Sequence, residues 1–172
     1  MYYIASDHAG FEVKNNLKDK MRMQGIHLVD LGPTVLDPGD DYPLYALDLA
    51  QEVAGDVMLN KGILICSSGA GMVIAANKVK GVRAAEIANV DEAVLSRQHN
   101  DANVLVLSKL ALDYELYTRI IKVWLTTPFS FEERHLRRIK EITDYEGSTE
   151  FSLPQVPEVS QEAGVPQDAG VP

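Results

Sequence analysis

Short apolar runs alternate with longer amphipathic segments along the first 147 residues of the chain. Five of the short runs have the length and composition of β-strands. These predicted strands are Tyr2–Ser6, His27–Leu31, Gly62–Cys66, Val82–Ile87 and Asn103–Leu107. The run Gly62–Cys66 is almost entirely apolar, which is typical of a strand at the buried centre of a parallel sheet.

Between the strands, apolar residues recur at helical spacing. The predicted helices are Phe11–Gln24, 41–54, Gly71–Val79, Asp91–Gln98, Asp113–Leu125 and Phe131–Asp144. Asp41 is the predicted N-cap of the second helix, with Pro43 just inside it. The alternation predicts a single-domain α/β fold, a doubly wound and mainly parallel five-stranded sheet in a Rossmann-like three-layer sandwich. In such sheets, ligands bind beyond the carboxyl ends of the strands.

The end of the chain differs in composition from the rest. Residues 148–172 contain four of the eight prolines, repeat the unit AGVP at 163–166 and 169–172, and show no apolar period. We therefore expect a folded domain over residues 1–147 and an acidic, disordered tail over residues 148–172.

Charge and cysteine content narrow the possible partners. Of the net charge of −9, residues 144–172 carry −6, because they hold six acidic residues and no Lys or Arg. An acidic chain disfavours broad electrostatic binding to nucleic acid or to a membrane surface. The single cysteine, Cys66, excludes an internal disulfide framework, and no signal peptide or membrane span is recognisable. We expect a soluble, cytoplasmic protein.

The segment around Cys66 is the strongest candidate for chemistry. A predicted buried strand ends at Cys66, a loop of small residues follows, and a helix is predicted from Gly71. Successive backbone N–H groups in such a loop attract negative charge, and this position favours a lowered pKa of the thiol. Cys66 is thus a candidate base or nucleophile beside an oxyanion cradle. A buried, inert cysteine before a tight turn is the alternative.

The same loop does not match nucleotide-binding patterns. Gly69 and Gly71 supply G-x-G, but Ile74 stands where the dinucleotide fingerprint needs its third glycine. No G-K-[ST] follows, so the segment is not a P-loop either. Nucleotide binding is disfavoured.

A local basic cluster stands out in this acidic chain. Arg134, Arg137, Arg138 and Lys140 fall within seven positions. Arg134 and Arg138 have i,i+4 spacing and share one helix face, and two guanidinium groups so placed suit a phosphate. A solvated helix face is the alternative explanation.

The four histidines occupy different positions. His8 follows Asp7 at the end of the first predicted strand, where a ligand is expected. His99 lies in the polar segment RQHNDANV, which places it at a helix end or in a site. His27 begins a strand pattern, and His135 lies within the basic cluster. For each of them, a hydrogen-bonded structural role is the alternative to catalysis.

Five segments in order resemble one family. SDHAGFEVK, DYPLYA, GILICSSGAGMVIAANKVKGVRAA, SRQHNDANVLVL and RHLRRIKEI are together similar to the type B ribose-5-phosphate isomerases, a family that includes the galactose-6-phosphate isomerase subunits. The resemblance covers about residues 2–145. It implies an aldose–ketose isomerisation of a phosphosugar through a cis-enediolate, without metal or cofactor. It also implies a homodimer or homotetramer whose sites lie at the subunit interface.

The resemblance further implies roles for individual residues. Cys66 is the implied base that moves a proton between C2 and C1, and His99 assists opening of the furanose ring. The implied substrate contacts are Asp7, His8, Tyr42, Ser67, Ser68, Gly69, Ala70, Gly71, Asn100, Arg134 and Arg138, the two arginines for the phosphate. Proton abstraction beside a carbonyl needs a base of suitable pKa and donors aimed at the enediolate oxygen, and the Cys66 loop offers both.

Two positions depart from the family's pattern. Ser68 stands where the family often has Thr, and Leu110 stands where it commonly has an arginine that helps to hold the phosphate. Lys109 is adjacent, but side chains of neighbouring strand residues point to opposite faces. The substrate could therefore differ from ribose 5-phosphate.

The leading hypothesis is an isomerase that interconverts ribose 5-phosphate and ribulose 5-phosphate. An isomerase of a hexose 6-phosphate, of the allose or galactose type, is the nearest alternative. Two alternatives come from other classes: a non-catalytic sugar-phosphate-binding protein, and a Cys-dependent hydrolase that uses Cys66 and His99.

Overall fold

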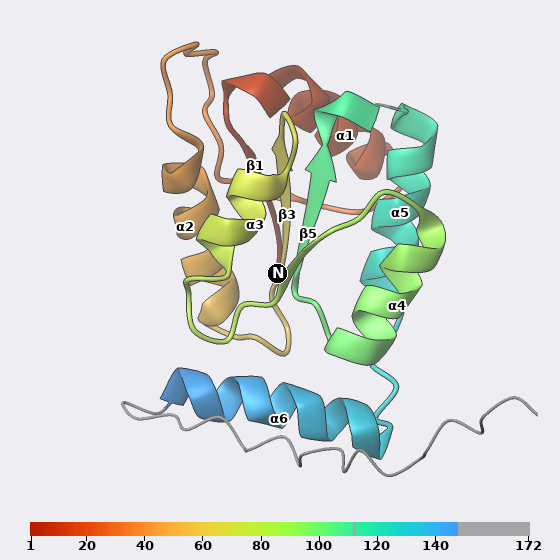
Figure 1. Cartoon of the computed structure of the whole chain (residues 1–172). Coiled ribbons are helices and arrows are strands. Elements are labelled where there is room, and N and C mark those ends of the chain that lie inside the picture. Colours follow the sequence, from red (N-terminus) through yellow and green to blue (C-terminus); the bar gives the residue numbers. More distant parts are fainter. Residues whose placement is uncertain (112, 148–172) are drawn as a thin grey trace, which may run out of the picture.

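Five parallel strands form the sheet in the computed structural model, which describes residues 1–111 and 113–147 (Figure 1). The strands are β1 (Tyr2–Ser6), β2 (Val29–Asp30), β3 (Lys61–Cys66), β4 (Ala84–Glu86) and β5 (Val104–Ser108). Their order across the sheet is β2-β1-β3-β5-β4. The predicted five-stranded parallel sheet is confirmed, whereas the predicted tail over 148–172 lies outside the described residues.

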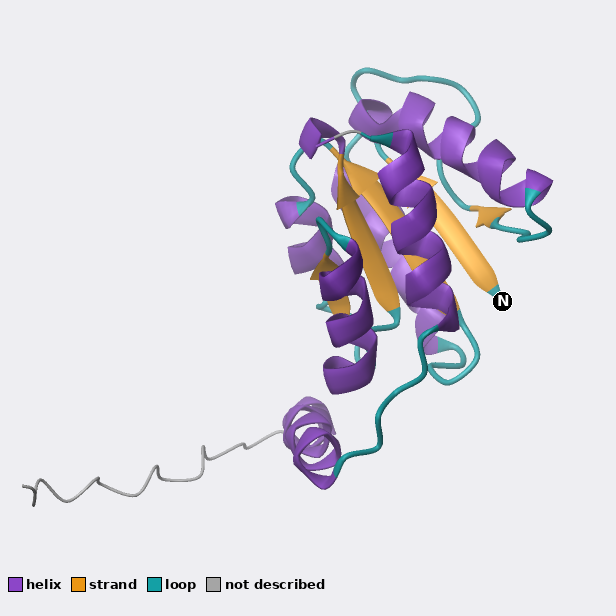
Figure 2. Cartoon of the chain, turned by 90° about the vertical axis from the view of Figure 1, so that its right-hand side faces the viewer, coloured by secondary structure: helices purple, strands orange, loops and turns teal. Residues whose placement is uncertain are grey.

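Helices cover both faces of the sheet, as a doubly wound fold requires (Figures 1 and 2). One face packs against α1 (Phe11–Met23), α4 (Val90–Asn100) and α5 (Tyr114–Thr126). The other packs against α2 (Tyr42–Ala54) and α3 (Ala70–Ala76). Because side chains alternate along a strand, Ile63 and Ile65 of β3 enter the first core, while Leu64 and Cys66 enter the second.

The chain changes its winding direction between β1 and β3. β1 pairs with β2 on one side and with β3 on the other. A crevice for ligands opens at such a switch point, beyond the carboxyl ends of the two strands. Asp7 directly follows β1 and Cys66 ends β3, so both residues lie at this switch point.

Helix α6 (Glu133–Gly147) stands apart from the two helical layers and crosses the opposite end of the sheet, where the strands begin (Figures 1 and 2). It is fastened near both ends: the backbone N–H of Ser130 donates to the Gln98 carbonyl at 3.2 Å, and Gly81 N–H donates to the Glu146 carboxylate at 2.9 Å. A cavity of about 520 Å³ lies between the helix and the sheet. None of the described helices is long and apolar enough to cross a membrane.

The structure differs from the sequence predictions mainly in short elements. β2 is limited to two residues, and two 3-10 helices, His8–Gly10 and 109–111, were not predicted. Lys109 and Leu110 therefore do not lie on a strand, and the argument that their side chains point to opposite sheet faces is wrong. Asp41 does occupy the N-cap of α2, but its side chain makes no capping hydrogen bond.

Candidate active site

A buried thiol–carboxylate pair lies at the carboxyl ends of β1 and β3. The Cys66 Sγ donates to Asp7 Oδ2 at 3.0 Å, and Asp7 Oδ1 accepts the backbone N–H of Gly10 at 3.1 Å. Gly10 is needed here because a Cβ at this position would lie 2.5 Å from the Ile65 carbonyl oxygen. The turn after β1 thus packs directly on β3, which brings the Asp7 carboxylate to the sulfur.

The pKa of Cys66 departs from the sequence expectation. Burial raises the pKa of the thiol to about 11, and the hydrogen bond and negative charge of Asp7 act in the same direction. Backbone N–H groups of Ser67 and Gly69 stabilise the thiolate, but their effect on the pKa is smaller. The predicted lowering of the pKa is therefore wrong for the isolated chain, because burial of the thiol and, after it, the contact with Asp7 outweigh the backbone N–H groups of the loop.

The loop after Cys66 turns sharply into α3. Gly69 has a φ of +82°, a left-handed conformation that favours glycine, and it occupies the N-cap of the helix without a capping side chain. The first N–H groups of α3, from Ala70 and Gly71, have no partner within the helix. The ring of Tyr42 packs on Gly71 so closely that a Cβ there would lie 2.7 Å from it. The predicted residues of this loop are thus brought together with Tyr42.

His8 is held by an acidic residue from a distant part of the chain. One oxygen of Asp40 accepts the backbone N–H of His8 at 2.9 Å and lies 2.7 Å from its Nδ1. The hydrogen bond with Asp40 is the main reason why the pKa of His8 is raised. The His8 bonds outweigh the effect of burial and hold the pKa of Asp40 below its ordinary value. We call the residues Asp7, His8, Asp40, Tyr42 and 66–71 the carboxyl edge.

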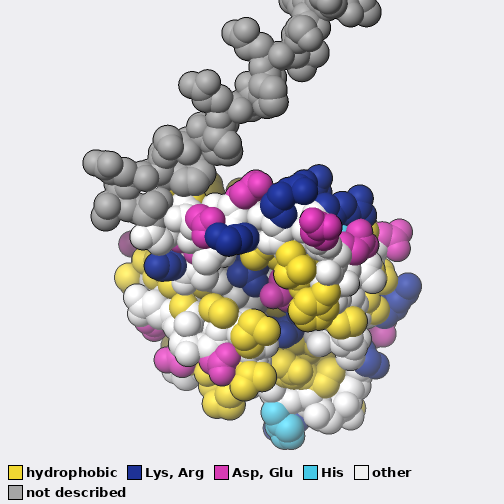
Figure 3. All heavy atoms as spheres, turned by 90° about the horizontal axis from the view of Figure 1, so that it is seen from below, with side chains coloured by type: hydrophobic (Ala, Val, Ile, Leu, Met, Phe, Trp, Pro, Cys, Tyr) yellow, Lys and Arg dark blue, Asp and Glu magenta, His cyan; other side chains and the backbone are white. Residues whose placement is uncertain are grey.

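The remaining predicted site residues lie at the other end of the sheet. His99 and Asn100 form the last turn of α4, and Arg134 and Arg138 project from α6. Asn100 and Arg138 line the cavity beneath α6. We call these four residues the amino edge. Figure 3 views this end and shows Lys and Arg side chains at several places on the face, with Asp and Glu among them and hydrophobic side chains between them.

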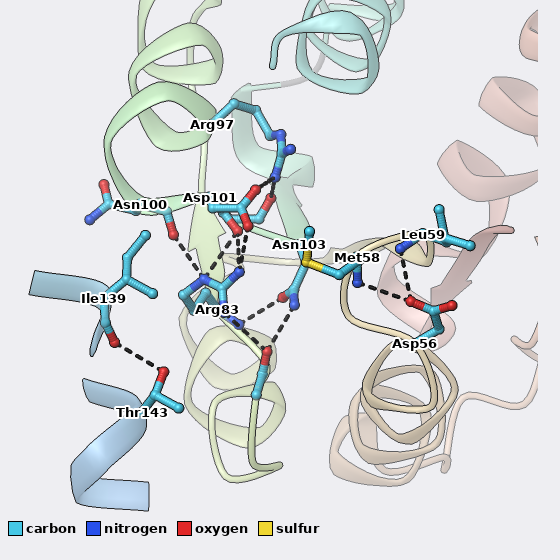
Figure 4. Close-up of polar contacts among 12 residues, drawn as sticks. Asp56, Met58, Leu59, Arg83, Arg97, Asn100, Asp101, Asn103, Ile139 and Thr143 are labelled. Atoms are coloured by element: carbon cyan, nitrogen blue, oxygen red, sulfur yellow. Dashed lines mark hydrogen bonds and ion pairs between the residues drawn. The ribbon is translucent and has the colours of Figure 1, made fainter. Parts of the chain in front are cut away.

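An arginine–aspartate network fixes the end of α4 (Figure 4). Asp101 follows the helix in a left-handed conformation, φ 45°, and its carboxylate accepts from Arg83 at 2.9 Å and from Arg97 at 2.7 Å. Arg83 also donates to the Asn100 carbonyl at 2.8 Å. The Arg97 guanidinium lies 5.8 Å from the ring centroid of Trp124. This network holds the backbone that carries His99 and Asn100.

The length of the strands shows that the two edges of one chain are too far apart to contact the same small ligand. The five residues of β5 span roughly 16 Å at about 3.3 Å per residue, and the edges lie at its opposite ends. A five-carbon phosphosugar is shorter than this separation. The structure therefore brings together nine of the 13 predicted site residues at the carboxyl edge, and it places His99, Asn100, Arg134 and Arg138 elsewhere.

Leu110 and Lys109 follow β5 at the carboxyl edge. The Leu110 backbone N–H donates to the Ser67 carbonyl at 3.3 Å, and its side chain is 77% exposed. An apolar group thus stands beside the Cys66 loop at the position for which the resemblance suggests an arginine. Among the described residues, no group of three His, Cys, Asp or Glu side chains is arranged to hold a metal ion.

Sequence reasoning missed four residues that contact the candidate site. Asp40 bonds to His8 across 32 positions, Asp101 closes the arginine network, and His135 stacks on His99. Glu86 lies 3.1 Å from where a Cβ on Gly69 would stand. Asp40 directly precedes the DYP segment and Asp101 lies inside HNDAN, but neither pattern indicates which side chain it contacts.

The fold and the two edges define a class of protein: a doubly wound α/β protein with a thiol–carboxylate site at its switch point. A sequence model described as Ribose/Galactose Isomerase matches residues 2–142. The chain belongs to this family.

Individual relatives agree with this assignment. A probable ribose-5-phosphate isomerase B of Mycoplasma pneumoniae is 44% identical over 144 residues, which cover 84% of this chain and 93% of the relative. The ribose-5-phosphate isomerase B of Escherichia coli is 39% identical, with 81% and 92% covered. The crystal structure of ribose-5-phosphate isomerase B from Mycoplasma genitalium with bound ribulose-5-phosphate superimposes with a TM-score of 0.81 at 40% identity, covering 86% of this chain and 97% of that one.

Proposed function

We propose that the protein interconverts ribose 5-phosphate and ribulose 5-phosphate, with Cys66 as the base. The observation that carries this proposal is the thiol of Cys66 placed at the switch point, bonded to Asp7 and followed by a loop of backbone N–H donors. The relatives named ribose-5-phosphate isomerase B support the same reaction and the same substrate class. A reacting thiol must stay reduced, which favours the cytoplasm as the compartment.

In this reaction, Cys66 moves one proton between neighbouring carbons. His99 first opens the furanose by taking the proton of the C1 hydroxyl and protonating the ring oxygen. The Cys66 thiolate then removes the proton from C2, and the electron pair forms the enediolate whose oxygen the N–H groups of Ser67 to Gly71 stabilise. The hydroxyl proton on O2 passes to O1, the same sulfur returns the carbon-bound proton to C1, and the C2 oxygen becomes the ketone. No bond to the protein is formed at any step.

A thiol with a pKa of about 11 must lose its proton before it can act. Asp7 Oδ2, at 3.0 Å, offers the nearest acceptor for it. Positive charge brought close to the sulfur favours the thiolate and lowers its pKa. The chain carries such charge at its amino edge, in Arg134 and Arg138.

We propose that each site combines the carboxyl edge of one copy with the amino edge of a second copy. Within one chain the two sets of residues are separated by the length of the sheet, so His99 and Cys66 cannot reach one pentose. A two-fold dimer pairs each edge with the other and forms two equal sites. In such a dimer the two arginines, of which Arg134 is paired with Glu132 at 2.9 Å, would face the acidic groups Asp7 and Asp40 of the other copy. Asn100 then binds a sugar hydroxyl, and Arg134 and Arg138 bind the phosphate.

The proposed function is tested with a panel of aldose 5- and 6-phosphates in the presence of EDTA, with Cys66→Ala as the control. We expect turnover of ribose 5-phosphate that Cys66→Ala abolishes, while binding of the phosphosugar persists. Turnover of a hexose 6-phosphate alone would assign the other sugar and identify Leu110 as the place to look for changed specificity. Binding without turnover would identify a sugar-phosphate-binding protein and refute the proposal.

A further inference from the structure

His135 is the buried side chain of α6, with 1% of its surface exposed. Its Nδ1 lies 2.8 Å from Ser130 Oγ, and its ring centroid lies 4.3 Å from that of His99 at an interplanar angle of 40°. This spacing is close to the range of about 4.5–7 Å in which aromatic rings attract each other. A helix that is otherwise exposed or half-buried thus inserts one flat ring against the candidate ring-opening residue.

The His99 imidazole has few other restraints. Within residues 1–111 and 113–147 it makes no hydrogen bond and no ion pair, and the stack on His135 is its ring contact. The network of Asp101 with Arg83 and Arg97 fixes the backbone next to His99. The orientation of the His99 side chain therefore depends on the ring of His135.

Burial and the neighbouring charged groups favour the neutral form of His135. Burial, the neighbouring His99 and the guanidinium groups of Arg134 and Arg138 lower the pKa of His135, whereas Glu132 acts against them. A neutral ring does not repel a His99 that gains a proton during catalysis. His135 also lies between Arg134 and Arg138 in sequence, so its burial sets the rotation of α6 and hence the place of both arginines.

We propose that His135 is a positioning residue for the ring-opening step, because its buried ring holds the His99 imidazole against the substrate. This inference rests on the proposed function. The contact between His135 and His99 lies within one chain, so it does not depend on how copies assemble.

Two reactions separate ring opening from proton transfer. Conversion of ribose 5-phosphate starts from a closed furanose and needs both steps. Ribulose 5-phosphate cannot close such a ring, because its O5 is esterified. Exchange of a C1 hydrogen of ribulose 5-phosphate for solvent deuterium, followed by NMR, therefore reports the Cys66 step alone.

Two variants of His135 test whether the flat aromatic ring is needed or only the volume of the side chain. His135→Leu fills the buried space without a ring, and His135→Phe keeps the ring. We expect His135→Leu to lower kcat/KM for conversion about tenfold or more, with the deuterium exchange within about twofold of the wild type. His135→Phe is expected to retain conversion within about threefold. His27→Ala, at an exposed histidine before β2 that belongs to neither edge, is the matched control and leaves both reactions unchanged.

The inference is overturned if His135→Leu lowers exchange and conversion in the same proportion, or if the Leu and Phe variants are equally active. Should the Leu variant fail to fold, Ser130→Ala removes the hydroxyl bound to His135 and is expected to raise the ratio of exchange to conversion; an unchanged ratio then overturns the inference. If the wild-type protein catalyses neither conversion nor exchange, the proposed function is refuted as well. Normal wild-type turnover with equal Leu and Phe variants refutes only the role of His135.

Discussion

The carboxyl edge and the amino edge differ in the burial and in the charge of their side chains. At the carboxyl edge, Asp7 and Cys66 are buried in the sheet itself and bonded to each other. At the amino edge, Arg134 and Arg138 are exposed on a helix that stands off from the core. The fold thus holds Cys66 and Asp7, which would move the proton between the carbons, more rigidly than the two arginines that would bind a distant phosphate.

This difference follows from what each group has to do. Proton transfer requires heavy atoms at hydrogen-bond distance with fixed orientation, and strands packed on both faces provide that. A guanidinium binds a phosphate over several angles, and charge acts over longer distances. Arginines that bind a phosphate can therefore stand on a single amphipathic helix outside the core.

The largest expected effect concerns the division of one site between two copies. Cys66→Ala and His99→Asn each remove one group, and we expect losses in kcat/KM of about 10³-fold and about 10²-fold. When the two inactive variants are unfolded together and refolded, activity should return to about a quarter of the wild type, because half of the dimers are mixed and each has one intact site.

A matched mixture gives the control for this experiment. Cys66→Ala and Cys66→Ser both lose the thiol of the same edge, so a mixed dimer of these two contains no intact site and should stay inactive. If the Cys66→Ala and His99→Asn mixture also stays inactive, the two edges do not complete each other across copies. Activity is measured on ribose 5-phosphate, and dimer exchange is confirmed by mass spectrometry of tagged chains.

The next effect concerns stability at the amino edge. Asp101→Ala leaves the buried Arg97 guanidinium without its carboxylate, and we expect the free energy of unfolding in urea to fall by about 2–4 kcal/mol. Lys140→Ala removes an exposed ion pair with Asp144 on α6 and should change it by less than about 1 kcal/mol. Equal losses in the free energy of unfolding would mean that the Asp101 network stabilises the fold no more than the exposed ion pair on α6 does.

A smaller effect concerns the thiol itself. Removing the negative charge in Asp7→Asn favours the thiolate and lowers the pKa of Cys66, so the thiolate fraction at pH 8 rises. A fall of about one unit speeds alkylation by iodoacetamide about tenfold at that pH. Asp40→Asn alters a carboxylate of the same edge that does not contact the sulfur and should leave the rate unchanged. A slower reaction in Asp7→Asn would contradict the assignment of Asp7 as the partner that raises this pKa.

The smallest effect is expected at the end of the chain. A protein that ends at Gly147 should keep the wild-type kcat/KM and melting temperature, because the residues of both edges precede this point. Thermal unfolding and the ribose 5-phosphate assay check this prediction. A melting temperature lowered by more than about 4 °C would show that residues 148–172 contribute about 1 kcal/mol or more to the folded state.

The sheet could be predicted well because its central strands have strong local signals. The apolar runs that end at Ser6 and Cys66 match β1 and β3, and the strand rule correctly placed the Cys66 loop at the carboxyl end of the sheet. β2 was predicted too long, since an edge strand is limited by its pairing with β1 and not by its own sequence. The short 3-10 helices have no period long enough to detect.

The site could be predicted only in part, because side-chain partners depend on the tertiary fold. The direction of the pKa shift of Cys66 was wrong, because burial of the sulfur and, after it, the contact with Asp7 outweigh the loop N–H groups, and no pattern in the sequence shows that contact. The direction of α4 decides where His99 lies: the helix runs back along the sheet and ends where the strands begin. Only the assembled layers reveal that the implied residues form two groups.

The tryptophan beside Arg97 gives this protein a built-in optical probe. Trp124 is the only tryptophan in the chain, it is fully buried, and its ring lies beneath the guanidinium of the network at the amino edge. Its fluorescence therefore responds to the environment of one end of the molecule, while the Cys66 end has no indole to contribute. Emission recorded during refolding or subunit exchange would follow the formation of the amino edge without any label.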